Sequence, residues 1–313
     1  MKYLAKKLAA LVVTLLVVSL LAFLAFQVIP GDPTTKILGT EATEEAVAAL
    51  REELGLNENV FIRYFRWLGN FLTGDFGMNY SRHIPVSDLL GDGLVVTFSL
   101  TLLSFIITAA VAIPLGILAG STRSRFVDGA FAVGDQVLMS IPTFFMATLL
   151  TWIFGIVLSL FRPGQYVSYL DSVPGFLGCL AVPAISIAIP RIAMTVKMLR
   201  SSIQEQMEQD YVRTARSRGN HRRAILRRHV LKNAMVSTVT FLAVSAAEIM
   251  TGSIIIEQVF GLPGAGQLLL EGISNREYLT VQAIVVILAA WVVLVNFLAD
   301  ILHQLLDPRV RYE

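Results

Sequence analysis

Long apolar runs are the feature that most constrains the fold of this chain of 313 residues. A helix needs roughly 20 apolar residues to cross the hydrocarbon core of a membrane. Six segments meet that length: residues 8–29, 94–119, 136–161, 176–199, 234–256 and 279–302. Because lipid offers no partner for backbone polar groups, runs of this length must pair them internally, as helices do. The sequence therefore predicts an all-α polytopic membrane protein with six transmembrane helices.

The overall composition agrees with this class. Apolar residues make up 55% of the chain and charged residues 15%, whereas a soluble domain has about 25% charged residues. The first run is longer than the apolar core of a signal peptide, and no small-x-small cleavage site follows it, so we expect it to be retained as the first span. We divide the chain into residues 1–29, an extracytoplasmic insertion at 30–92, and a five-helix core at 93–313 that includes a loop at 200–232.

The distribution of basic residues predicts the orientation. If the N-terminus lies in the cytoplasm, the inner segments hold most of the Lys and Arg residues, above all those between Arg200 and Lys232. Lys and Arg accumulate in cytoplasmic loops. We therefore expect both termini in the cytoplasm.

The fourth and fifth runs contain residues that are costly in lipid. Pro183, Pro190, Arg191 and Lys197 lie in the fourth run, and Glu248 lies in the fifth. A carboxylate within a span costs about 2.5–3.5 kcal/mol unless it faces water or a partner. We expect Glu248 to face a water-filled path or, equally, to hydrogen-bond to the neighbouring helix.

The segment 30–92 has room for folded elements outside the membrane. Thr43 can cap a helix that begins with Glu44 and Glu45 and continues to Gly55. Residues 61–72 form a second amphipathic segment with aromatic residues at helical spacing. We expect it to lie at the membrane interface, with an aromatic ligand cage as the alternative.

Residues 210–233 form an arginine-rich interruption between the fourth and fifth runs. Residues 210–218 are good helix formers with an acid at the start, and Gly219 can adopt the left-handed conformation that closes a helix. Asn220 can cap the next helix. This pattern predicts a helix–glycine–helix elbow, although charge alone fits an ordinary basic loop equally well.

The chain does not carry the patterns of an enzyme. Its four histidines are scattered without the spacing of zinc ligands, and no Ser–His or paired-carboxylate arrangement lies at one depth. Cys179 is the single cysteine, so no disulfide within the chain and no cysteine metal site is expected. The sequence lacks the phosphate-binding pattern G-x-x-x-x-G-K-S/T, so we expect no cofactor in the chain itself. A non-transporting membrane scaffold is an alternative class, and no nucleic-acid partner is expected.

Two stretches of the elbow carry a family signature. They read Tyr211-Val212-Arg213-Thr214-Ala215-Arg216-Ser217-Arg218-Gly219 and His229-Val230-Leu231-Lys232-Asn233-Ala234. They resemble the cytoplasmic coupling loop of ABC-importer permeases, closest to the dipeptide/oligopeptide/nickel branch. That loop carries an "EAA, three residues, Gly" motif. The peptide branch typically has Arg-Thr-Ala at its first three positions, as Arg213-Thr214-Ala215 do here. Gly219 falls at the motif's glycine, whereas Ser237 stands where relatives often carry a proline.

Further motifs extend the resemblance over nearly the whole chain. In order they are Pro30-Gly31-Asp32-Pro33, Leu54-Gly55-Leu56, Tyr64 to Trp67, Gly74-Asp75-Phe76-Gly77 and Pro85-Val86. Their order resembles the B-type permease subunit of peptide importers. Residues 257–266 resemble the family's outer re-entrant connection, in which glycines and a proline allow a tight non-helical path.

The resemblance implies an ABC importer type I permease fold and a subunit that forms half of the translocation pathway for di- or oligopeptides. Nickel complexes or another small solute are the alternative cargo. The implied partners are a homologous C-type permease, two ATP-binding subunits that bind ATP and Mg, an extracytoplasmic solute-binding protein and the lipid of a bacterial or archaeal cytoplasmic membrane. The implied ATPase-coupling residues are Asp210, Tyr211, Arg213, Thr214, Ala215, Arg216, Arg218 and Gly219. We assign Glu248, Glu257, Phe260 and Pro263 to the pathway.

Overall fold

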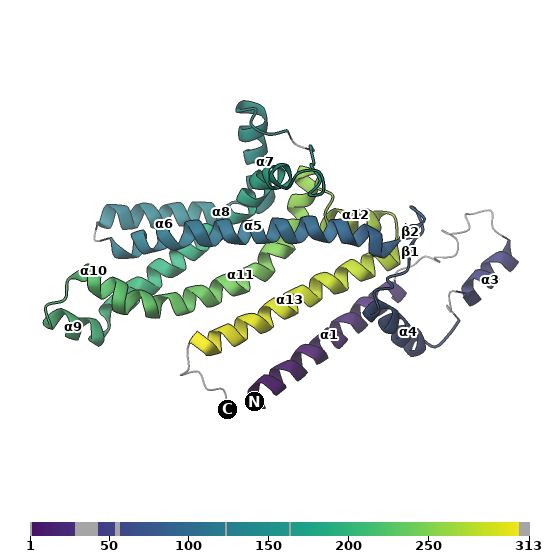
Figure 1. Cartoon of the computed structure of the whole chain (residues 1–313), viewed down its shortest axis with the longest axis horizontal. Helices are drawn as coiled ribbons and strands as arrows, with labels where there is room; N and C mark the ends of the chain where they lie inside the picture. The colour runs from purple at the N-terminus through teal and green to yellow at the C-terminus, as the bar shows by residue number, and fades with distance from the viewer. Residues whose placement is uncertain (1, 29–42, 54–56, 123, 163, 307–313) are drawn as a thin grey trace. The chain divides into compact units, whose positions relative to one another are not determined.

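The computed structural model describes residues 2–28, 43–53, 57–122, 124–162 and 164–306. The regular secondary structure of the described chain is helical apart from one short hairpin (Figure 1). The chain forms two compact units. Unit 1 comprises Met1–Leu94 and Leu268–Val293, and unit 2 comprises Val95–Gln267 and Leu294–Glu313. The Pro30–Pro33 and Leu54–Leu56 motifs lie outside the described residues.

Within the described residues, five helices are long and apolar enough to cross a membrane. These are α1 (Lys2–Val28), α5 (Val86–Ser121), α8 (Val173–Glu208), α11 (Leu231–Phe260) together with the short helices before it, and α13 (Tyr278–Leu306). A bent pair of helices supplies a sixth span if it is counted as one. The predicted all-α polytopic fold is thus confirmed. Five of the six apolar runs lie in single long helices, and the third run is bent.

The third run is a broken helix and not the straight span that its composition suggests. Helix α6 (Arg125–Ser140) ends before Pro142, and α7 (Thr143–Leu150) continues as the π-helix η1 (Thr151–Val157) at an angle of 96° to α6. Ile141 is extended, with φ −79° and ψ 121°. A residue before proline is pushed out of the helical region, and proline lacks the N–H that would continue the helix. The break therefore follows from Pro142.

Unit 2 is built on the packing of α8 against α11. Their buried contact includes Leu180, Ala184 and Ile187 from α8, and Ile249 and Ile256 from α11. Residues three or four apart share a helix face, which is why these positions form one apolar seam. Pro183 and Pro190 lie within α8, and the helix continues past both of them.

Small residues bring α5 close to α8 in the same unit. A Cβ added at Gly116 would lie 2.8 Å from the Leu199 side chain, and one at Gly120 would lie 2.8 Å from that of Ile203. These glycines lie four residues apart on one face of α5. Such spacing allows two membrane helices to approach more closely than larger residues permit.

Unit 1 contains the elements between the first two spans. They are α3 (Glu44–Glu53), α4 (Val60–Leu72), β1 (Met78–Asn79) and β2 (Ile84–Pro85), with β1 and β2 paired antiparallel. Thr43 Oγ1 accepts a hydrogen bond from Ala46 N at 3.3 Å, as expected of a residue that caps α3.

The aromatic residues of α4 divide between two environments. Tyr64 is buried, its hydroxyl lies 2.8 Å from Ser19 Oγ of α1, and its ring meets Phe23 edge-on at 5.6 Å. Phe61 and Phe65 are exposed. Part of the predicted interfacial segment therefore packs against α1, and only the opposite face is exposed as an interfacial helix would be.

Candidate functional site

The predicted elbow is present and lies at one end of α8 and α11 (Figure 1). Helix α9 (Asp210–Ser217) follows α8 after the single residue Gln209. Asp210 lies in the first turn of α9, where a negative charge is favoured by the helix dipole. Sequence spacing therefore predicted both the helix and its start.

One face of α9 is buried. Val212 is fully buried and Ala215 is 8% exposed, three residues apart on the same side of the helix. They pack in an apolar cluster with Leu199 and Ile203 of α8 and with Ile225 beyond the elbow. Ala215 was predicted to contact a partner, but in this structure it holds α9 against its own chain.

The other face of α9 is polar and exposed. Its outward residues are Asp210, Arg213, Thr214, Arg216 and Ser217, followed by Arg218. Tyr211 is half-buried, and its hydroxyl donates to Gln206 Oε1 at 2.8 Å. Arg213 and Asp210 form an ion pair at 3.5 Å. Because both side chains of that pair are exposed, it contributes little to stability and leaves their charged groups available to a partner.

Gly219 closes α9 in the left-handed conformation, as predicted. Its φ is +78°, and its N–H donates to Arg216 O at 3.0 Å. No described atom lies within 4 Å of the position that a Cβ would take. The glycine is therefore required for its backbone angle and not for space, since residues with a Cβ are strained there.

Asn220 has a different role from the predicted one. Its Nδ2 donates to Ala215 O at 3.1 Å, so it completes α9 instead of capping the next helix. Helix α10 (Arg222–Ile225) begins after His221, and within the described part of the chain no side chain caps it. The chain then passes through the π-helix η2 (Leu226–Val230) into α11. The N-cap position of α10 is His221, one residue later than predicted, and Asn220 N also donates to Ala215 O at 3.3 Å.

Two arginines of this region are structural. Arg222 Nη2 donates to Ser121 O at the end of α5 at 3.2 Å. Arg200 Nη1 donates to Asp128 O at 2.8 Å and pairs with Asp128 Oδ1 at 3.2 Å. Asp128 also accepts from Gln204 Nε2 at 3.0 Å. Asp128 was not singled out from the sequence; its position in the first turn of α6 is the one signal that marks it.

Glu257 is a buried carboxylate near the end of α11. Its side chain is fully buried, and its Oε1 accepts from Thr97 Oγ1 of α5 at 2.7 Å. Its Oε2 accepts from Gly266 N at 2.7 Å, in the first turn of α12 (Ala265–Ser274). Thr97 Oγ1 in turn accepts from Ala265 N at 2.9 Å. Glu257 and Thr97 together satisfy the N–H groups that begin α12.

The glycine-rich connection after α11 is shaped around this carboxylate. Gly261 ends α11 with φ +64° and ψ 35°. A Cβ at Gly264 would overlap the Glu257 carboxylate, and one at Gly266 would lie 2.6 Å from Ile254 Cα. The glycines predicted to allow a tight path therefore also provide space for Glu257.

The remaining pathway candidates have different environments. Phe260 is buried in the α8–α11 core, with its ring centroid 5.8 Å from that of Phe161, whereas Pro263 is exposed. Glu248 forms an ion pair with Arg191 of α8. This contact is the hydrogen bond to the neighbouring helix that was one of the two expectations for Glu248. A role of these four residues in the pathway stays a prediction.

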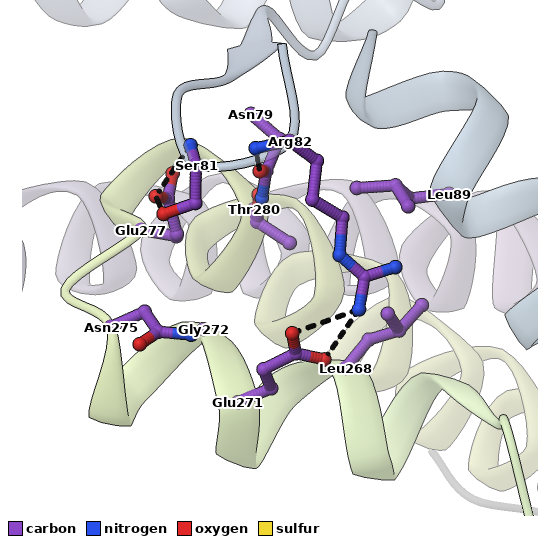
Figure 2. A pocket seen from close by; sticks show the side chains of 10 residues that line it. All are labelled: Asn79, Ser81, Arg82, Leu89, Leu268, Glu271, Gly272, Asn275, Glu277 and Thr280. Carbon is purple, nitrogen blue, oxygen red and sulfur yellow. Dashed lines mark hydrogen bonds and ion pairs between the residues drawn. The ribbon is translucent and has the colours of Figure 1, made fainter. Parts of the chain in front are cut away.

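A second polar cluster lies in unit 1, where the hairpin loop meets α12 and the start of α13 (Figure 2). Glu277 is 3% exposed and accepts from Tyr80 N and Ser81 N, each at 3.1 Å, and from Ser81 Oγ. Asn79 Nδ2 donates to Thr280 Oγ1 at 3.1 Å. Arg82 Nη2 reaches both carboxylate oxygens of Glu271 at 2.8 Å. These contacts, unsuspected from the sequence, fix the hairpin loop to the α12–α13 turn.

Comparison with protein families gives two adjoining matches. Residues 112–312 match the family described as "Binding-protein-dependent transport system inner membrane component". Residues 1–101 match the family described as "Binding-prot-dependent transport system membrane comp, N-term". The first match includes the elbow and the Glu257 connection.

Individual relatives align over their full length. The chain is 37% identical over 308 residues to a protein of Brucella abortus (strain 2308) named as a peptide transport system permease protein, with 98% of each chain covered. It is 34% identical over 310 residues to a peptide ABC transporter permease protein of Sinorhizobium fredii, with 99% of each covered. It is 30% identical over 313 residues to a glutathione transport system permease protein of Salmonella paratyphi A, with 100% of each covered.

A solved structure supports the fold. The chain is similar to a crystal structure of an amino acid ABC transporter, with a TM-score of 0.51 and 17% identity, over 72% of this chain and 95% of that one. At this identity the likeness concerns the fold alone. It agrees with the type I permease fold expected from the motifs.

Proposed function

The chain belongs to the family of binding-protein-dependent transport system inner membrane components, and we propose that it forms half of the pathway through which an ATP-driven importer takes up short peptides. The peptide cargo is proposed because relatives that align over the full chain are named for peptide or glutathione transport. Glutathione is itself a short peptide.

The single observation that carries the mechanism is the two-faced helix α9. Its buried face, Val212 and Ala215, packs on α8 and on the chain leading to α11, while its charged face is exposed. A partner that binds the exposed face can therefore move two spans through one rigid contact. We assign docking to Asp210, Arg213 and Arg216 with their neighbours, whereas Ala215 supports α9 from beneath.

The partners of the importer complete the proposal. Two ATP-binding subunits hold ATP and Mg, and closure of their dimer is transmitted through α9. A homologous second permease supplies the other half of the pathway, and a solute-binding protein delivers the peptide from outside. Alternation between outward-open and inward-open states then follows from rigid movement of the spans. The distribution of basic residues supports a location of both termini in the cytoplasm, on the same side as α9.

Charge reversal on α9 tests the docking. The tagged chain is co-expressed with its ATP-binding subunits, and their recovery is measured after purification in detergent. Arg213→Glu combined with Arg216→Glu should reduce recovery at least about tenfold, because complementary charges across an interface become repulsive. The matched control is Arg227→Glu with Arg228→Glu, two exposed arginines of η2 outside α9. Equal loss in both variants would favour a basic loop without a docking helix.

The cargo is tested by transport. The full complex, with its solute-binding protein, is reconstituted into vesicles and supplied with labelled trialanine or glutathione. Uptake that requires ATP supports peptide import. Absence of uptake of either peptide, in a complex whose ATP hydrolysis is stimulated by its binding protein, would contradict the proposed cargo while leaving the family assignment intact.

A further inference from the structure

We propose that Arg191 and Glu248 form a binding site for the two charged ends of a peptide in transit, with Glu248 receiving the ammonium group and Arg191 the carboxylate. The proposal rests on the peptide import proposed above and assigns a substrate-recognition role to an ion pair that links α8 and α11. Its ligand class is a short peptide with free ends.

The pair lies deep within the spans. Arg191 is about 26 Å from either end of α8, and Glu248 is about 18 Å from the Phe260 end of α11, at 1.5 Å per residue. Ionisable residues at such depth are rare in membrane helices. Where they occur they face the bundle interior or water and mark substrate pathways.

The exposed residues of α11 show which environment the pair faces. Apart from Lys232 near the start, they form one stripe along the helix, mostly at spacings of three, four or seven positions. The stripe contains the polar residues Asn233, Ser237, Glu248, Thr251 and Gln258 and the aliphatic residues Val244, Ile255 and Val259. A stripe with this much polar surface is unfavourable against hydrocarbon. It is suited to a water-filled path.

Helix α5 provides an internal comparison in the same unit. Its exposed face carries Leu102, Ile106, Val111, Leu115 and Leu118, all of them apolar. That face is suited to lipid. The contrast between the two helices indicates that the stripe on α11, and Glu248 within it, faces a different medium from the outside of α5.

The exposure of the pair leaves it accessible to a ligand. The side chain of Glu248 is 51% exposed, and that of Arg191 is 24% exposed. Arg191 Nη1 donates to Glu248 and lies 3.9 Å from Met194 Sδ, and among the described residues no other acidic side chain pairs with it. A peptide ammonium offers Glu248 the same kind of charged donor as Arg191 does, and the released guanidinium can bind a carboxylate through two N–H groups.

Packing of α8 on α11 does not depend on this pair. The two helices already share the buried seam that includes Ile187 and Ile249, each within four residues of the pair. Glu257 shows how a structural carboxylate of the same helix is built, since it is fully buried and accepts hydrogen bonds from Thr97 and Gly266. Glu248 lacks such enclosure, which favours a ligand-binding role.

The test compares peptides that differ at one end. The complete importer with its binding protein is reconstituted, and ATP-dependent uptake is measured for trialanine, N-acetyl-trialanine and trialanine amide. Glu248→Gln should lower the preference for trialanine over the acetylated peptide at least about threefold and leave the preference over the amide unchanged; Arg191→Gln should do the reverse. The binding protein is the same in every arm, so its own preference cancels in these ratios, as in a double-mutant cycle.

Controls separate the site from the helix contact. Glu58→Gln removes an exposed Glu–Arg pair, with Arg66 in α4, and should leave all ratios unchanged. Glu248→Asp keeps the charge and should keep the preference for a free amino end. Unchanged ratios in Glu248→Gln would overturn this inference and leave the proposed cargo intact. Failure of that variant to assemble would do the same. If the wild-type complex imports none of the three peptides, the proposed cargo fails and this inference fails with it.

Discussion

Thr97 and Glu257 are joined by a buried hydrogen bond of 2.7 Å between the hydroxyl and the carboxylate. The bond links α5 to the end of α11, and through Ala265 it also holds the first turn of α12. A fully buried carboxylate is costly unless it is hydrogen-bonded. The pair therefore explains why an acidic residue is tolerated inside this connection.

The first prediction concerns the stability of that connection. Thr97→Val keeps the shape of the side chain and removes the hydroxyl, which leaves Glu257 Oε1 and Ala265 N without that partner. We expect a loss of about 1–3 kcal/mol in the free energy of unfolding, measured as a lower Tm in detergent. Ser253→Ala, which removes a longer contact of 3.3 Å to Glu257, should cost less. A Tm of Thr97→Val equal to that of the wild type would contradict the capping role.

The second prediction concerns Gly219. Gly219→Val should strain the left-handed end of α9 by at least about 1 kcal/mol, whereas Gly219→Asn should be tolerated, because asparagine adopts this conformation more readily. Because no described atom lies within 4 Å of a Cβ at this position, neither side chain should clash. The two variants should therefore differ in how readily each residue adopts the left-handed backbone angle. We expect the valine variant to insert normally but to release the ATP-binding subunits or to hydrolyse ATP without transport. Equal transport by both variants would show that the shape of the elbow does not matter.

The third prediction separates two acidic residues of the outer cluster. Glu277→Ala removes a buried acceptor of backbone and side-chain hydrogen bonds, so we expect a loss of about 2–3 kcal/mol in the stability of unit 1. Glu271→Ala removes a half-exposed ion pair with Arg82 and should cost less than about 1 kcal/mol. Hydrogen exchange of the hairpin amides, at Tyr80 and Ser81, measures both. A larger increase in exchange for Glu271→Ala than for Glu277→Ala would contradict the contacts in Figure 2.

The fourth prediction concerns orientation. Single cysteines at Arg63 and Arg216, in a Cys179→Ala background, are treated with an impermeant thiol reagent on intact cells. The position in α4 should be labelled, and the position in α9 should be labelled only after the membrane is opened, because basic residues collect on the cytoplasmic side. If only the Arg216 position is labelled on intact cells, the orientation is opposite to the predicted one. The docking proposal would then be wrong.

The sequence was sufficient where the signal is local. Gly219 closes α9, Thr43 caps α3, and five of the apolar runs form single helices, because conformation and hydropathy at these sites depend on neighbouring residues. The family was recognisable for the same reason, since the coupling-loop motif is a continuous stretch.

The sequence was insufficient where two distant segments meet. Glu277 binds residues about 200 positions earlier in the chain, and Arg200 meets Asp128 of α6, pairings that no local pattern encodes. Ala215 is buried because its face of α9 packs against Leu199 and Ile203 of α8. The local sequence does not show which face of α9 makes this contact. The helix break before Pro142 is a different case, because its cause, the proline, is visible in the sequence. It was missed because the prediction of spans used hydropathy alone.

The single residue between α8 and α9 has a mechanical consequence. With Gln209 as the whole connection and Val212 locked in the apolar cluster, there is no slack chain to absorb a displacement of α9. Helix α8 has 36 residues and is about 54 Å long. As a stiff rod of that length, tilted by about 5°, it would sweep its far end through about 5 Å, roughly the length of one helical turn. A small displacement of α9 is therefore passed directly to α8 and enlarged along its length, without any loop having to refold.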